Sequence, residues 1–214
     1  MRVAGLAVVS ALVLAACNPS GPGQSAGAGG VFPNLTTASY RIEATVTHDA
    51  GAMPVVMIRD GATRQRVEIA TPAGPTTMIT NSETGESFVL TNAGGQMMAM
   101  RMDADQFDDP AKDWSAEVAS TARRTGDCAV AGENGAVWTR DDNGTPNTVC
   151  VTSDGIILRV TEGDRTVWET TSIQRGPQSA ELFVLPPGVQ VMDLGDVGSA
   201  MQDMLERAQS QAGQ

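Results

Sequence analysis

Basic residues are scarce in this chain of 214 residues, which contains a single lysine, Lys112, and a single histidine, His48. Arginine supplies nearly all of the remaining positive charge, and the net charge is −11. An acidic chain without a basic run does not favour nucleic acid as a partner, and it argues against electrostatic docking to anionic lipid.

Motifs of catalysis are missing as well. There is no Gly-x-Ser-x-Gly, no phosphate-binding loop, and no Cys-x-x-Cys or other spacing of metal ligands. His48 and Asp49 stand together in a segment expected to be a turn, where a solvated surface pair is the usual explanation. We therefore expect no enzymatic activity, no cofactor and no metal site.

The N-terminus has a single charged side chain, Arg2, followed by an apolar stretch over residues 3–16. This stretch is too short for a membrane-spanning helix, which needs ~20 residues, and it fits the apolar region of a secretory signal. The sequence Leu14-Ala15-Ala16-Cys17 resembles the lipobox of bacterial lipoproteins. That resemblance implies that Cys17 becomes the first mature residue and carries acyl chains; the alternative is an ordinary cleavage site after Ala16.

Composition divides the chain into four parts. We expect a signal peptide at residues 1–16, a lipidated cysteine and flexible Gly/Ser/Pro tether at 17–34, one folded domain at 35–194, and a helix and tail at 195–214. The resemblance to bacterial lipoproteins also implies a membrane. In that group, a residue other than aspartate after the lipidated cysteine favours the outer membrane, and here that residue is Asn18.

Cys128 and Cys150 remain as a pair once Cys17 is assigned to the lipid. In an exported protein the default state of such a pair is a disulfide. If consecutive strands lay side by side here, the two cysteines would be two strand spacings apart, ~9.6 Å, whereas a disulfide needs Cα atoms within ~7 Å. We therefore expect either that the segment around Cys128 leaves the sheet and folds over, or that the strand order is not sequential.

The domain reads as mainly β, because apolar and polar residues alternate with period two and turn residues recur at short intervals. Tyr40, Ile42 and Ala44, for example, alternate with Arg41 and Glu43. The expected strands cover residues 40–47, 53–59, 64–69, 76–80, 88–90, 96–102, 129–131, 136–140, 148–152, 156–161, 165–175 and 189–192, with a turn at 132–135.

Three short helices are expected beside the strands. Residues 111–123 can form a helix that lies across the open face of the sheet as a lid, although a strand from Glu117 onward fits equally well. Ser179 can cap a single turn over residues 180–183. Residues 197–208 place apolar side chains at helical spacing and predict a C-terminal helix.

Methionine is concentrated in the first half of the domain. Met98, Met100 and Met102 fall on one face of their strand, and Met57 and Met78 lie in neighbouring strands. Because methionine adapts to varied apolar partners, these five residues are candidates for the wall of an apolar cavity. A core filled with methionine is the structural alternative, and Cu(I) binding by thioethers is disfavoured because no His or Cys cluster lies nearby.

The closing block Glu181-Leu182-Phe183-Val184-Leu185-Pro186-Pro187-Gly188-Val189-Gln190-Val191 resembles the ending of the LolA/LolB-like superfamily of periplasmic lipoprotein carriers. Residues 150–159, in which a cysteine-bearing strand turns at Asp-Gly, resemble exported relatives of that group. The resemblance implies a half-open antiparallel β-barrel with short covering helices, whose concave apolar face holds acyl chains.

Taken together, the sequence predicts a monomeric outer-membrane lipoprotein on the periplasmic face, which binds a hydrophobic ligand or a lipoprotein acyl chain. The alternative is an envelope scaffold with a filled core and no ligand. A continuous apolar cavity lined by the methionine positions would favour the first of these.

Overall fold

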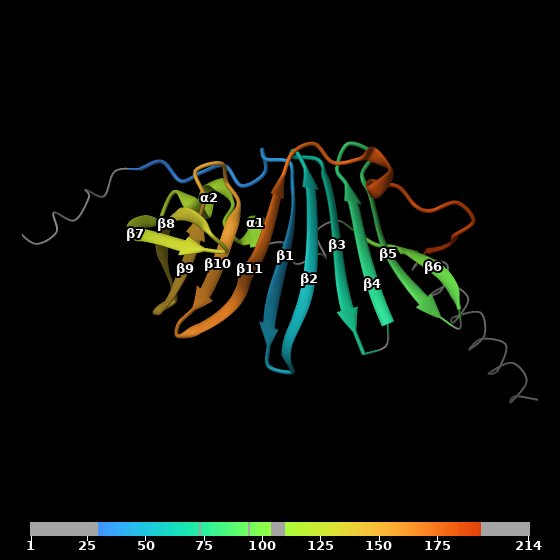
Figure 1. The fold of residues 1–214 in the computed structure, drawn as a ribbon, viewed down its shortest axis with the longest axis horizontal. Helices are drawn as coiled ribbons and strands as arrows, with labels where there is room; N and C mark the ends of the chain where they lie inside the picture. The colour runs from blue at the N-terminus through green and yellow to red at the C-terminus, as the bar shows by residue number, and fades with distance from the viewer. Residues whose placement is uncertain (1–29, 73, 94, 104–109, 194–214) are drawn as a thin grey trace, which may run out of the picture.

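One open β-sheet organises the protein in a computed structural model that describes residues 30–72, 74–93, 95–103 and 110–193 (Figure 1). Its twelve strands are ordered β12-β6-β5-β4-β3-β2-β1-β11-β10-β9-β8-β7, so that β12 and β7 are the two edges. The strands are β1 (Tyr40–His48), β2 (Gly51–Asp60), β3 (Arg64–Thr71), β4 (Gly74–Asn81), β5 (Glu86–Ala93), β6 (Gln96–Arg101), β7 (Arg123–Val130), β8 (Glu133–Asp142), β9 (Thr145–Val151), β10 (Ile157–Glu162), β11 (Arg165–Arg175) and β12 (Gln190–Asp193).

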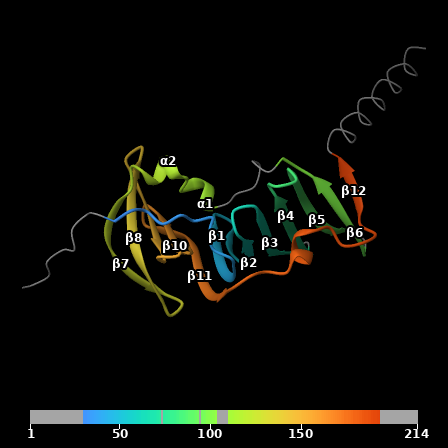
Figure 2. The same ribbon diagram turned by 90° about the horizontal axis from the view of Figure 1, so that it is seen from above.

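The predicted mainly β fold is confirmed. Neighbouring strands pair antiparallel throughout, except that β12 runs parallel to β6. Seen from above, the sheet forms an open arc, and the helices α1 (Pro110–Asp113) and α2 (Ala116–Ala119) lie on its inner side (Figure 2). The predicted C-terminal helix lies outside the described residues.

The alternation that predicted the strands also divides the sheet into two faces. In β1, Tyr40, Ile42 and Ala44 are buried on the inner face, where they join a core cluster that contains all three tryptophans, Trp114, Trp138 and Trp168. All three indole side chains are buried there. The inner core therefore depends on a few aromatic side chains, in a chain that is only 4% aromatic.

The 3₁₀-helix η2 (Ala180–Phe183) packs on the outer face of β3 and β4. Phe183 is buried there against a second cluster that includes Ile58, Ile79 and Phe88. The Arg66 Nη1 group donates a hydrogen bond to the Leu182 carbonyl oxygen at 3.2 Å and ties η2 to β3. This half of the sheet is thus buried on its outer side by the chain that leads into β12.

The expected helix over residues 111–123 is corrected to two single turns. At the break, the Ser115 amide donates to the Lys112 carbonyl oxygen at 3.1 Å, an i→i+3 bond that tightens the chain. The hydroxyls of Ser120 and Thr121 then donate to the carbonyl oxygens of Glu117 and Val118, and thereby compete with continuation of α2. The alternative strand begins only at Arg123, not at Glu117.

Two local expectations are also wrong. Ser179 precedes η2, but its hydroxyl makes no capping hydrogen bond, and only its carbonyl oxygen accepts from the Leu182 amide. The turn expected at residues 132–135 is shorter, because Ala131 and Gly132 both have positive φ and reverse the chain within two residues. As a result β8 begins at Glu133, three residues earlier than expected.

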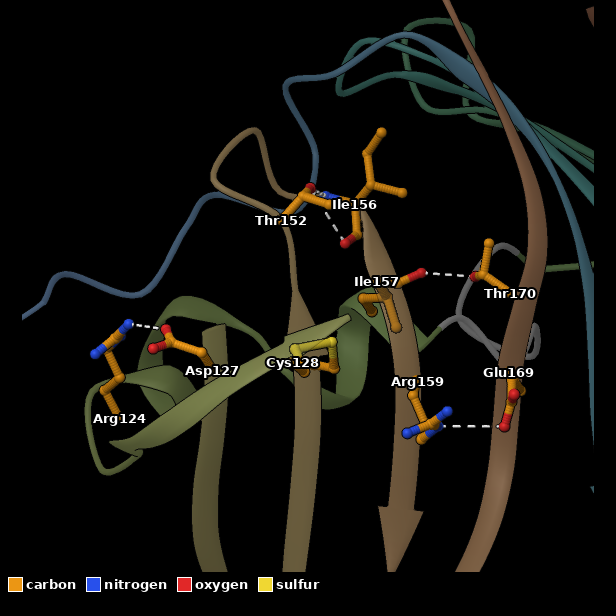
Figure 3. The surroundings of a disulfide bond; sticks show 10 residues. Arg124, Asp127, Cys128, Thr152, Ile156, Ile157, Arg159, Glu169 and Thr170 are labelled. Carbon is orange, nitrogen blue, oxygen red and sulfur yellow. Dashed lines mark hydrogen bonds and ion pairs between the residues drawn. A yellow bond between two sulfur atoms is a disulfide. The ribbon is translucent and has the colours of Figure 1, made fainter. Parts of the chain in front are cut away.

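The disulfide between Cys128 and Cys150 is present, and the strand order around it is sequential (Figure 3). β7 pairs with β8 and β8 with β9, yet the two Cα atoms are only 6.1 Å apart. The expectation that one arrangement excludes the other was wrong, because β7 stays in the sheet while folding back over it. Gly135, opposite Cys128, permits this: a Cβ atom there would lie 2.6 Å from the Val151 carbonyl oxygen.

The N-terminal segment also belongs to the folded domain. Phe32, inside the range assigned to the tether, stacks on Trp114 with ring centroids 5.5 Å apart and meets the Trp138 ring edge-on at 5.2 Å. Gly155 has φ +86°, and a Cβ atom there would lie 2.0 Å from the Asn34 carbonyl oxygen. The predicted Asp-Gly turn thus provides the close approach that seats residues 34 and 35 on the domain.

Candidate functional site

The predicted methionines share the inner face of the sheet. Cross-strand pairing places Met57 beside Val67, Val67 beside Met78, Met78 beside Val89, and Val89 beside Met100. Met98 and Met102 lie two residues on either side of Met100 in the strand direction, and Met98 faces Thr91. The period-two alternation therefore predicted the shared face of Met57, Met78, Met98 and Met100, although the sequence could not tell which of them border a cavity. Met102 follows the last residue of β6.

A cavity of about 400 Å³ opens on this inner face between β1–β4 and β9–β11. Its volume falls within the range of small-molecule sites, ~300–1,000 Å³. Trp114, at the junction of α1 and α2, borders the side opposite the sheet. The lining residues are Val46, Thr47, His48, Met53, Val55, Met57, Val67, Ile69, Met78, Asp113, Trp114, Asn147, Val160, Glu162, Arg165, Val167 and Trp168.

The structure brings only part of the predicted wall to this cavity. Met57 and Met78 line it, whereas Met98, Met100 and Met102 lie beyond it, on β6 and the residue that follows. Cys17 lies outside the described residues. Three lining residues were not predicted from the sequence: Trp114, Trp168 and Asn147. For the two tryptophans the one available signal was their scarcity, because such large aromatic residues rarely lie far from a core or a site.

The side chains in and beside the cavity change from apolar to polar along the strand direction. One cross-strand row contains Val149, Val160, Trp168, Val46 and Met53. The row beside it, at the strand ends, is Arg140, Asn147, Glu162 and Arg165.

Among the buried polar atoms that have no hydrogen-bond partner within the described part of the chain are Oδ1 of Asn147 and Nε of Arg140, in the polar row, and Nε1 of Trp114, on the cavity wall. Asn147 is 9% exposed and Trp114 is 2% exposed. The Arg140 guanidinium lies over the Trp114 ring with its Cζ atom 5.3 Å from the centroid. An unpaired buried polar atom costs ~1–3 kcal/mol, so this end of the cavity would gain from a polar group that reaches it.

A second and larger cavity, of about 680 Å³, lies between residues 30–36, the helices α1 and α2, and Trp138. Its lining includes Gly30, the first residue that the structure describes. For that reason we assign the candidate site to the smaller cavity, which the sheet encloses with described residues alone.

Three ionisable groups with shifted pKa values, Glu133, Asp154 and Arg175, lie together at the folded-over corner of the sheet. Arg175, at the end of β11, donates two hydrogen bonds to the Glu133 carboxylate at 2.8 and 3.0 Å and two to the Asp154 carboxylate at 2.7 and 3.4 Å. These hydrogen bonds lower the pKa of Glu133 and the pKa of Asp154 below their ordinary values. The same contacts raise the pKa of Arg175 further, so it stays charged at all accessible pH.

Stability should therefore depend on this arginine in an acid-sensitive way. A carboxyl group whose pKa is lower in the folded state stabilises the protein above its unfolded-state pKa, about 4, and loses that contribution as the pH falls through the folded value. In urea unfolding, the arginine-to-glutamine variant R175Q should be less stable than the unmodified protein at pH 7. The difference should shrink below about pH 4, where both carboxyl groups become protonated.

The control for this measurement is R123Q, which makes the same charge change at an exposed position of β7. It should not produce a pH-dependent difference of this size. A stability difference between R175Q and the unmodified protein that stays constant from pH 7 to pH 2.5 would contradict the role of the Arg175 contacts.

Two further findings concern the described residues. Among them, no group of three or more His, Cys, Asp or Glu side chains is placed so that it could hold a metal ion. Within the same ranges no helix combines the length and apolarity needed to cross a bilayer.

Comparison with solved structures shows that the fold is shared by other proteins. The crystal structure of MucB is similar with a TM-score of 0.54 and 16% sequence identity, over 74% of this chain and 61% of MucB. An uncharacterized conserved protein from Thermus thermophilus is similar with a TM-score of 0.50 and 14% identity, over 75% of this chain and 92% of that protein. At these identities the likeness shows the fold alone. No protein-family model and no curated protein matches the sequence.

Proposed function

We propose that this protein is an outer-membrane lipoprotein whose domain binds a hydrophobic ligand, such as an acyl chain, in the cavity on the inner face of its sheet. The observation that supports this most directly is the cavity of about 400 Å³, whose walls include Met53, Met57 and Met78. Flexible, polarisable thioether side chains suit apolar partners of varied shape. A cavity of this size also counts against the alternative of a scaffold with a filled core.

The change from apolar to polar side chains along the cavity supports an amphiphilic ligand. An apolar tail would lie along Val55, Met57 and Val67, and a polar head would reach the row that contains Asn147 and Glu162. There it could accept a hydrogen bond from the Trp114 indole or donate one to the Asn147 side-chain oxygen, after a small rotation of either side chain. The mouth carries both signs of charge, with Arg165 paired to Asp49 at 2.5 Å, so it favours no strongly charged head.

The proposed location rests on the sequence. Acyl chains on Cys17 would hold the domain at the membrane, since two or more chains anchor a protein firmly. Asn18 favours the outer membrane, and the tether would leave the domain free to receive ligand on the periplasmic face. The acidic chain would not add electrostatic attraction to anionic lipid.

Filling the cavity should abolish binding. In M78W, a tryptophan replaces a half-buried wall residue, and the affinity for N-phenyl-1-naphthylamine, an uncharged apolar fluorescent probe, should fall by at least about tenfold, or 1.4 kcal/mol. The affinity is measured by titration of the fluorescence with purified protein.

The matched control is A129W, which introduces the same ring at an exposed position of β7, far from the cavity lining. It should bind the probe as the unmodified protein does, and circular dichroism should show that both variants keep the strand content. If the unmodified protein does not bind the probe, or if M78W binds it equally well, the cavity is not a ligand site and the scaffold alternative stands.

A further inference from the structure

At one edge of the sheet, no other element packs on the inner face of β5, β6 and β12 among the described residues. The helices α1 and α2 and the N-terminal segment pack over β1–β3 and β8–β11, and the cavity lining ends at Met78 on β4. Beyond that point the same face continues across three more strands. Its side chains there are Val89 on β5, Met98 and Met100 on β6, and Met192 on β12.

These side chains are partly exposed. Val89, Met98 and Met100 are half-buried, and Met192 is 37% exposed. On the opposite face of the same strands, Phe88, Leu90 and Ala99 are buried beneath η2 and the chain that follows it. Among the described residues, the sheet at this edge is therefore packed mainly on its outer side, and on its inner side the row Val89, Met100 and Met192 stays partly exposed. Exposed apolar rows of this kind mark a surface that another segment or molecule covers.

The chain itself continues from this edge. β12 ends at Asp193, one residue after Met192, and residues 194–214 follow it outside the described part. Their sequence places six small or apolar residues at helical spacing: Val197, Ala200, Met201, Met204, Leu205 and Ala208. Gly195 stands before them, where a residue free to adopt positive φ would let the chain reverse direction over the sheet.

The length of such a helix is sufficient to cross the strands at this edge of the sheet. A helix over residues 196–208 would be ~20 Å long at 1.5 Å per residue. The distance from β12 across β6 and β5 to β4 is three strand spacings, or ~14 Å. One such helix would therefore span the uncovered strands and end beside Met78, at the border of the cavity.

From these observations we propose that residues 196–208 dock as a helix across the inner face of β4–β6 and β12, with their apolar side on Val89, Met98, Met100 and Met192. The occupant is this chain's own C-terminal segment. A short connection keeps it at high effective concentration, so that docking needs little intrinsic affinity. The docking itself does not depend on the proposed function.

Methionine oxidation tests this docking in the full chain. Dilute hydrogen peroxide converts methionine to its sulfoxide at a rate that follows exposure, and peptide mass spectrometry resolves each site. In the double variant M201E/M204E, two charges on the apolar side of the segment should release it, and oxidation of Met98, Met100 and Met192 should become several-fold faster. Met97 is 45% exposed on the outer face and should not change, so it is an internal reference.

The matched control is S199E/Q202E, which adds the same two charges on the opposite side of the segment. It should leave all four oxidation rates as they are in the unmodified chain. Equal rates in M201E/M204E and the unmodified chain would overturn the proposal, as would an equal acceleration in the control variant. Protection that weakens on dilution would also overturn it, because a second copy of the chain would then be the occupant. Ligand binding by the cavity is measured separately and can succeed or fail independently of these outcomes.

Discussion

Replacing both cysteines with alanine (C128A/C150A) is expected to lower the free energy of unfolding by about 3 kcal/mol. The disulfide joins residues 22 apart in the sequence, and the loop it closes restricts the unfolded chain by roughly that amount. In the folded protein it also holds the outer edge strand β7 over its neighbours, next to the buried cluster of Val130, Cys150 and Leu158. Loss of the bond should therefore loosen β7 first.

The measurement is urea unfolding of the oxidised protein with and without a reducing agent, beside the double variant. Reduction should destabilise the unmodified protein to about the level of C128A/C150A and should not affect the variant, because Cys17 forms no part of this bond. Thiol labelling without reductant should find neither Cys128 nor Cys150 reactive. Coincident unfolding curves for the oxidised and reduced protein would show that the folded-over corner is held by packing and hydrogen bonds alone.

Truncating Trp114 to alanine should cost about 3–5 kcal/mol of unfolding free energy, the range for a large aromatic side chain removed from a core. Trp114 is buried in the inner cluster and stacks on Phe32, and Arg140 lies over its ring. It also borders both large cavities, so W114A would merge them and release the N-terminal segment. The change should be visible as a lower midpoint of urea unfolding and as faster proteolysis near residues 30–36.

Two further variants separate packing from general disturbance. W114F keeps an aromatic ring for Phe32 and removes the indole N–H that has no partner among the described residues, so it should cost less than about 1.5 kcal/mol. V31A changes a side chain that is 94% exposed and should stay within about 0.5 kcal/mol of the unmodified protein. If W114A were as mild as V31A, the short helices would not contribute to the core.

The sequence predicted most of the strands because most of them have one buried face. It predicted β7 poorly, since that strand begins at Arg123 and not at the expected residue 129. In β1 the buried Tyr40, Ile42 and Ala44 stand at every second position, and this pattern is local. The helix over residues 111–123 was harder to predict, because its apolar residues fit one long helix or a strand equally well. The hydrogen bonds of the Ser120 and Thr121 hydroxyls end α2, and the burial of Trp114 fixes the segment on the sheet. The burial of Trp114 depends on residues far away in the sequence.

For the candidate site, alternation alone placed Met57 and Met78 on the same face as Met100, because strand neighbours in register present the same side. It could not predict that the cavity ends at Met78, since that boundary is set by α1, Trp114 and the arc of the sheet. Asn147 was missed because a single polar residue in a strand has no distinctive sequence signal.

The chain by itself determined which side chains point inward, where the turns fall and that two cysteines were available to pair, because these follow from period-two patterning, turn residues and composition. Only the tertiary structure decided that Cys128 and Cys150 meet within a sequential sheet, that Phe32 docks on Trp114, and that β12 returns beside β6. Each of these contacts joins segments far apart in the chain or across several strands. Their formation depends on curvature and close approach, at Gly135 and Gly155 above all, and no local pattern encodes these.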